Sequence, residues 1–289
     1  MKTSWEILKK DKEIMLFPLI SIIISGFIIV SFIAPMYFFT RFEFSADMFE
    51  GYMIYVYMFA LYVPLYFVGT FFNTAVVGCA DARIKGEDPT FKDGLRLAGK
   101  NWYKILLWAL LAGTVGVVLQ MIRNKLSFIG KIASFFIGIA WTYGTFLIVP
   151  VLIFEDEGVL ASVKNSAKLF KDTWGETITG SIGFGIIIFI LAMIGIIPLA
   201  FLTILGVLSW LTAIVLGAVY FAVLFAFNSA LNGIFVTALY HFAKDGELPG
   251  PYTKDMIPSP VGGSVYDSGK GSGGYKTKSA SDNFYDKFG

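Results

Sequence analysis

Long apolar stretches alternate with short polar ones along most of this chain, and the apolar stretches contain no Asp, Glu, Lys or Arg. A helix is the stable form of such a stretch in hydrocarbon, because it satisfies its own backbone hydrogen bonds. About 20 apolar residues are needed for one crossing. Four stretches each fit one helix and a fifth is long enough for at least two; in chain order they are Ile14–Thr40, Tyr52–Ala80, Ile105–Ile122, Ile132–Phe154 and Thr177–Ala243.

The fifth stretch must turn outside the membrane, and the expected places are Pro198, Gly206 and the segment Leu208–Trp210. Two crossings within it give six spans in total, whereas three give seven. A repeated pattern favours six, because Asn73–Gly78 and Asn228–Gly233 are similar and each precedes a polar exit containing Lys, Gly, Glu and Pro. Similar helices with similar exits should end on the same side of the membrane. The predicted fold class is therefore all-α, a bundle of six transmembrane helices.

The distribution of basic residues predicts the orientation of this bundle. With six spans, 19 of the 23 Lys and Arg lie on the side of the two termini, and without the tail the ratio is still 13 to 4. Basic residues near spans stay cytoplasmic, so both termini are expected in the cytoplasm and the protein in the plasma membrane. The first apolar stretch is too long for a signal peptide, and no small-residue cleavage site follows it, so it should remain as a span. The basic residues on the opposite side are Arg41, Arg123, Lys125 and Lys131.

Two basic amphipathic segments precede the third and fifth spans and are expected to lie in the headgroup layer as interfacial helices. The apolar faces are predicted to consist of Phe91, Leu95, Ala98 and Trp102 in the first segment, and of Leu160, Val163, Ala167, Phe170 and Trp174 in the second. Contacts with anionic lipid headgroups are expected from Lys92, Arg96, Lys100, Lys164, Lys168 and Lys171.

Trp5 and Leu8 suggest a weaker third copy of this segment, which would make the chain three units of interfacial helix plus helical hairpin. The alternative is that any cytoplasmic loop of such a protein tends to be basic and amphipathic.

The chain divides into a transmembrane domain, residues 1–249, and a tail, residues 250–289, rich in Gly, Ser, Lys and Tyr. The tail has too few apolar residues to form a core and is expected to be disordered and cytoplasmic. Its last residues, 283–289, are aromatic again. They are either a docking motif for a cytoplasmic protein partner or a solvated terminus.

Composition narrows the function classes. The chain is 56% hydrophobic and 15% charged, whereas soluble domains carry about a quarter charged residues. A net charge of +2 gives no basis for a nucleic-acid partner. The single cysteine, Cys79, excludes an intramolecular disulfide.

The ionisable residues point away from an enzyme and from proton-coupled transport. No ionised residue lies within a predicted span, and a proton pathway usually needs one. The only histidine, His241, is expected at the cytoplasmic end of the last span with a hydrated ring. The acidic run Glu155–Glu157 either binds a divalent cation or caps the following helix. No nucleophile, phosphate-binding or metal-ligand spacing is present, so neither an enzyme nor a cofactor is predicted.

Amides and hydroxyls are the polar groups within the predicted spans, and they have two interpretations. They hydrogen-bond across closely packed helices, or Asn73 and Asn228, which the repeat relates, face each other and line a polar cavity. The candidate intramembrane residues are Asn73, Thr74, Asn228, Ser229 and Asn232.

One motif carries a resemblance to a known group of proteins. The run Val149–Gly158, with Ala161, Ser166, Leu169 and Trp174 after it, resembles an uncharacterised family of prokaryotic six-span membrane proteins, a domain of unknown function. That group is distantly similar to the membrane domain of some glycerophosphodiester phosphodiesterases. The resemblance covers about residues 1–250 and implies the fold. The soluble catalytic barrel of the phosphodiesterases is missing, so no catalytic residue carries over.

These observations favour a non-enzymatic integral membrane protein that scaffolds or regulates partners at the membrane. The alternative is a transporter or channel for a small solute or lipid, with the Asn residues along its route. A lipid-modifying enzyme is the third hypothesis. Small-residue helix faces permit oligomers without requiring them.

Overall fold

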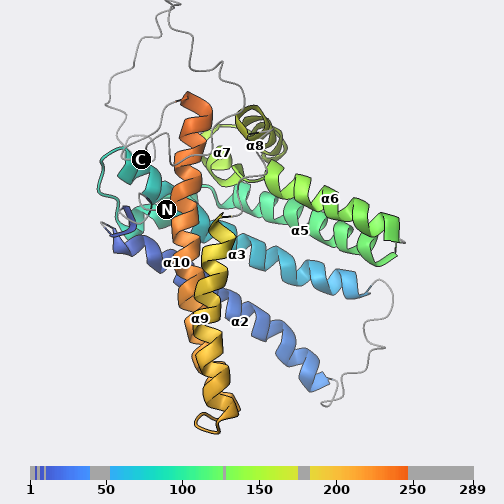
Figure 1. Ribbon diagram of the computed structural model, residues 1–289. Coiled ribbons are helices and arrows are strands. Elements are labelled where there is room, and N and C mark those ends of the chain that lie inside the picture. The colour runs from blue at the N-terminus through green and yellow to red at the C-terminus, as the bar shows by residue number, and fades with distance from the viewer. Residues whose placement is uncertain are drawn as a thin grey trace, which may run out of the picture.

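The computed structural model describes residues 4, 7–9, 11–39, 53–125, 128–174 and 183–246, and this part of the chain is helical (Figure 1). The all-α prediction is therefore confirmed. The predictions for the tail, for Trp5 and for the 175–182 segment lie outside the described residues. In chain order the helices are η1 (Lys12–Met15), α2 (Leu16–Phe39), α3 (Met53–Ile84), α4 (Phe91–Lys100), α5 (Trp102–Lys125), α6 (Phe128–Gly144), α7 (Ile148–Phe154), α8 (Val159–Trp174), α9 (Gly183–Ile204) and α10 (Trp210–Asp245).

Several of these helices are long and apolar enough to cross a membrane. Within the described part of the chain, α2 with η1, α3, α5 and α10 meet that criterion, and α6 with α7 makes a fifth span if the bent pair counts as one. The described part of α9 adds a shorter apolar segment, Leu191–Ile204. The described residues thus contain four to five candidate membrane spans by length and composition, as in a membrane protein.

Helix α3 lies at the centre of the bundle and contacts α2, α4, α5, α7 and α10. Small residues permit this packing: a Cβ atom at Gly78 would stand 2.2 Å from Leu97 Cδ2 of α4. The hairpins α2–α3, α5–α6 and α9–α10 diverge from a common end, where η1, α4, α7 and α8 lie (Figure 1). The buried core is concentrated near that end, around Ala75, Ala80 and Ala98.

The predicted span Ile132–Phe154 is not one straight helix. It breaks between α6 and α7, whose axes differ by 40°. Pro150 lies in the first turn of α7, where its missing N–H costs nothing, and so favours a helix start there. The backbone N–H of Leu147 leaves the helical ladder and donates to Ser166 Oγ of α8 at 3.2 Å.

The turn between α9 and α10 lies at two of the three expected places. Gly206 adopts a φ of 73°, a left-handed conformation that glycine tolerates. Ser209 caps α10, because its hydroxyl accepts from the Thr212 N–H at 3.1 Å. Pro198 does not turn the chain but lies inside α9, so that part of the prediction was wrong.

Candidate functional site

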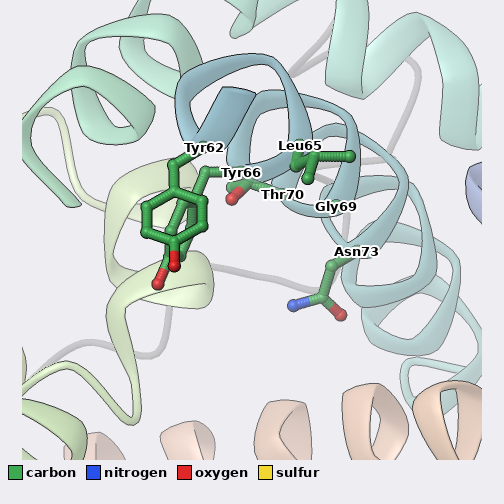
Figure 2. A pocket seen from close by; sticks show the side chains of 6 residues that line it. All are labelled: Tyr62, Leu65, Tyr66, Gly69, Thr70 and Asn73. Atoms are coloured by element: carbon green, nitrogen blue, oxygen red, sulfur yellow. The ribbon is translucent and has the colours of Figure 1, made fainter. Parts of the chain in front are cut away.

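Polar side chains gather along one face of α3, in a cavity of about 350 Å³ (Figure 2). We call it the α3 groove, and its lining residues are Tyr62, Leu65, Tyr66, Gly69, Thr70 and Asn73. Steps of three and four residues place them on the same side of the helix. The middle of α3 falls between Val68 and Gly69, so the groove lies at mid-depth of a helix that is a candidate membrane span.

The polar groups of the α3 groove make no hydrogen bond within the part of the chain that the structure describes. Among the described residues, no hydrogen-bond partner is found for the hydroxyls of Tyr62, Tyr66 and Thr70 or for the Asn73 amide. Thr70 is only 8% exposed, whereas Tyr66 is 43% exposed. The two tyrosine rings meet edge to face, with their centroids 6.5 Å apart. Figure 2 shows both hydroxyls pointing to the same side of α3 and the Asn73 amide directed away from the helix axis.

The far end of the groove lies against α10. A Cβ atom at Gly233 would stand 3.2 Å from Asn73 Oδ1 and 2.6 Å from Val76 Cγ1. Asn73 is therefore next to Gly233, more than one helical turn beyond Asn228, with which no described contact joins it. Asn228 and Ser229 are half-buried, and Asn232 is exposed.

Thr74, the neighbour of Asn73, is fully buried. Among the described residues its hydroxyl has no hydrogen-bond partner. The candidate residues thus lie along the contact of α3 with α10, but they do not form one site.

A second group of polar residues joins three elements at the common end of the bundle. Asp81, 2% exposed, lies with Oδ1 2.7 Å from His241 Nε2 of α10 and accepts from Lys85 Nζ at 2.7 Å. Glu155, which follows α7, accepts from Tyr240 Oη and Lys244 Nζ, both at 2.6 Å. His241 is therefore paired, with a side chain 19% exposed, rather than hydrated as predicted.

The N-terminal segment is held to α3 and α4 by charged groups. Arg83 forms ion pairs with Asp11, at 3.3 Å, and with Asp88. Burial raises the pKa of the Asp11 carboxyl above its ordinary value of 3.8, and the nearby Arg83 guanidinium opposes this shift. Glu13 accepts from the backbone N–H of Phe91 at 2.9 Å and so joins η1 to the start of α4.

Helix α4 is amphipathic, but it packs on the bundle rather than lying free in the headgroup layer. Thr90 and Asp93 form a capping box at its start. Its buried face consists of Asp93, Gly94, Leu97 and Ala98, whereas Trp102, which was expected on that face, begins α5 and is 52% exposed. Lys92, Arg96 and Lys100 are exposed.

Helix α8 also differs from the expected stripe. Leu160 is 67% exposed, and the buried positions are Val159, Ser162 and Ser166. Val163 and Phe170 of the expected stripe are half-buried and pack against buried clusters, and the Ser166 hydroxyl between them accepts from the Leu147 N–H. The exposed side carries Lys164, Lys168 and Lys171. The Trp174 side chain lies outside the described residues.

The acidic run does not gather into a cation site in the described part of the chain, which contains no group of three or more metal-ligating side chains. Glu155 faces Tyr240 and Lys244, whereas Asp156 is solvent-exposed and lies 3.8 Å from Lys104 Nζ.

A family model described as a family of unknown function, DUF6159, matches residues 52–250. The chain belongs to this family. The DUF6159 match begins one residue before α3 and ends after α10, so it includes both the α3 groove and the Asp81–His241 pair. The expectation of an uncharacterised family is confirmed. No curated protein and no solved structure matches the chain, so the similarity to phosphodiesterase membrane domains stays a prediction.

The sequence predicted Asn73 as a candidate site residue, but not the other residues that line the α3 groove. Their spacing does indicate one helix face, because steps of four, four and three residues separate Tyr62, Tyr66, Thr70 and Asn73. Aromatic residues are so common in this chain that two tyrosines in an apolar stretch did not stand out.

Proposed function

We propose that this DUF6159 protein is a non-enzymatic membrane scaffold with six spans and cytoplasmic termini, which holds or regulates partners at the membrane surface. The Asp81–His241 contact supports the six-span arrangement, because it brings the carboxyl ends of α3 and α10 together. An even number of crossings, α10 included, must then separate the carboxyl end of α3 from that of α10. Four crossings follow α3 in the chain, and they are α5, the α6–α7 pair, α9 and α10.

The observation that carries the scaffold proposal is the basic exposed face of each of two helices, α4 and α8. Six exposed cations lie on these two helices, whose opposite faces are fixed to the bundle. Lys and Arg held on fixed helix faces beside a membrane surface suit anionic headgroups and acidic protein segments. The cations are Lys92, Arg96, Lys100, Lys164, Lys168 and Lys171.

Movement of a small solute or lipid is the second candidate function, and the α3 groove favours it. Polar groups at mid-span are what a transported polar molecule needs. Flux into liposomes that is lost in Asn73→Leu would favour this candidate over the scaffold.

The scaffold proposal is tested by purification from native membranes in mild detergent, with mass spectrometry of the proteins and lipids retained. Three forms are compared: the full chain, a variant with all six cations replaced by Gln, and a chain that ends at Pro249. We expect the Gln variant to lose anionic lipid, and one of the two altered forms to lose a stoichiometric protein partner. An identical set of proteins and lipids on all three forms would contradict the proposal.

A further inference from the structure

We infer that the α3 groove binds the hydroxylated headgroup of a neutral lipid, of the diacylglycerol class. This inference goes beyond the scaffold proposal and does not depend on it.

The groove needs a polar ligand because of its depth. Hydrocarbon offers no hydrogen bonds, so each polar group left unpaired there costs free energy. The described residues give no partner to the hydroxyls of Tyr62, Tyr66 and Thr70 or to the Asn73 amide. These four groups lie along one helix face within about 16 Å, since eleven residues of helix rise by that length. A ligand with a hydroxyl and ester carbonyls can both donate to and accept from them.

The ligand should carry no net charge. The lining residues identified for the groove are two tyrosines, Leu65, Gly69, Thr70 and Asn73, none of which is ionised. A phosphate placed there would be a charge without a counter-charge in a medium of low dielectric constant. The phenol and amide groups instead suit alcohol and ester oxygens, and the cavity of about 350 Å³ is in the size range of pockets for small organic groups.

The ligand should be a lipid rather than a solute from water. Tyr66 is 43% exposed and Gly69 is exposed too, at the middle of α3. The groove therefore opens near the middle of a helix long and apolar enough to span the membrane, at the depth of the hydrocarbon. A molecule that arrives through the bilayer reaches this opening directly, and Leu65 offers an apolar contact for its acyl chain.

The test uses a photoactivatable diacylglycerol in phosphatidylcholine vesicles that hold the full chain, with labelled peptides mapped by mass spectrometry. We expect labelling of the peptide that contains Tyr62–Asn73. The double variant Tyr66→Phe with Thr70→Val keeps the shape of the groove and removes two hydroxyls. Labelling should fall about ten-fold, because the loss of two hydrogen bonds weakens binding by about that factor.

A matched control is available on α5. Tyr103 is 59% exposed, and Thr114 bonds only within its own helix, to Leu110 O at 2.7 Å. The double variant Tyr103→Phe with Thr114→Val should therefore leave the labelling unchanged. Equal loss in both double variants would overturn the inference, because it would mean that hydroxyls in general govern labelling.

Two further experiments test whether the ligand is neutral and whether it is a lipid. Photoactivatable phosphatidic acid, which differs by a charged phosphate, should label the groove much less than diacylglycerol. Equal labelling by both probes would overturn the neutral-lipid assignment. Free glycerol at millimolar concentration should not compete, and competition would show that the source is a water-soluble polyol.

Discussion

Hydrogen bonds and ion pairs at the common end of the bundle join residues that are far apart in the chain. Asp81 and His241 are separated by 160 positions, and Arg83 and Asp11 by 72. Glu155 meets Tyr240 across 85 positions. Each pair connects α10 or the N-terminal segment to another element, so these side chains determine how the helices are held together at that end.

Replacing Asp81 by Ala should lower the free energy of unfolding by about 2 kcal/mol, because His241 and Lys85 lose a charged hydrogen-bond acceptor in a buried setting. Reversible unfolding in mixed detergent micelles measures this change. Asp156→Ala is the control, since that carboxylate is solvent-exposed and contributes little. Adding His241→Ala to the Asp81 variant should cost less than His241→Ala alone, and strict additivity would contradict direct coupling.

Asp11 gives a prediction about pH. Its pKa is raised in the folded protein, mainly by burial. The folded state therefore binds the proton more tightly than the unfolded chain, and the free energy of unfolding should fall as the pH rises from the ordinary pKa of 3.8 to the raised value. Because Arg83 opposes the shift, Arg83→Gln should raise the pKa of Asp11 further. Infrared titration of the carboxyl group, assigned with Asp11→Asn, measures it.

Lys85→Gln is the matched control for this titration. Lys85 lies two residues from Arg83, but its amino group bonds to Asp81 rather than to Asp11. The pKa of Asp11 should therefore change much less in Lys85→Gln than in Arg83→Gln. An equal change in both variants would mean that the overall positive charge nearby, rather than the ion pair with Arg83, determines the pKa of Asp11.

Helix α4 shows how two glycines of one element differ. A Cβ atom at Gly94 would stand 2.6 Å from Phe17 Cζ, 2.8 Å from Cys79 Sγ and 3.2 Å from the Ala75 carbonyl oxygen. At Gly99 nothing lies within 4 Å. The first glycine is required for the packing of α4 on α2 and α3, and the second is not.

Gly94→Ala should therefore destabilise the protein by about 1–3 kcal/mol through overpacking. Gly99→Ala should be neutral or stabilising by up to about 1 kcal/mol, because Ala favours a helix. Thermal unfolding and amide hydrogen exchange of α4 check both values. Equal stability of the two variants would mean that α4 is not tightly packed.

Across the whole molecule, the three helical hairpins share one end and diverge toward the other (Figure 1). The proposed orientation places the shared end, with α4 and α8, in the cytoplasm. The α9–α10 turn at Gly206 then lies on the opposite side of the membrane.

Cysteine labelling tests this orientation directly. Cys79, the only cysteine, is buried, and Cys79→Ala gives a background for single cysteines. An impermeant maleimide should label Ser209→Cys in intact cells. It should label Lys92→Cys only in permeabilised cells. The reversed pattern would contradict cytoplasmic termini, and labelling of both in intact cells would contradict an odd number of crossings between them.

Local patterns along the chain were enough to predict the elements. The absence of charge over about 20 residues is a property of the sequence, and it located the helices that can cross the membrane. The turn at Gly206 and the exposed cations of α4 and α8 also follow from local rules, since a left-handed turn needs glycine and ionised side chains avoid burial.

Only the tertiary structure decided which side chains meet. Asp81 was assigned to a loop, yet α3 continues to Ile84 and carries its carboxylate to His241. At the break before α7, the backbone N–H of Leu147 is paired with Ser166, a residue of another helix. Asn73 lies against Gly233 rather than Asn228, because the crossing of α3 and α10 fixes the register of their contact. Periodicity specifies the faces of a helix, but the partner of each face depends on angles and contacts between distant segments.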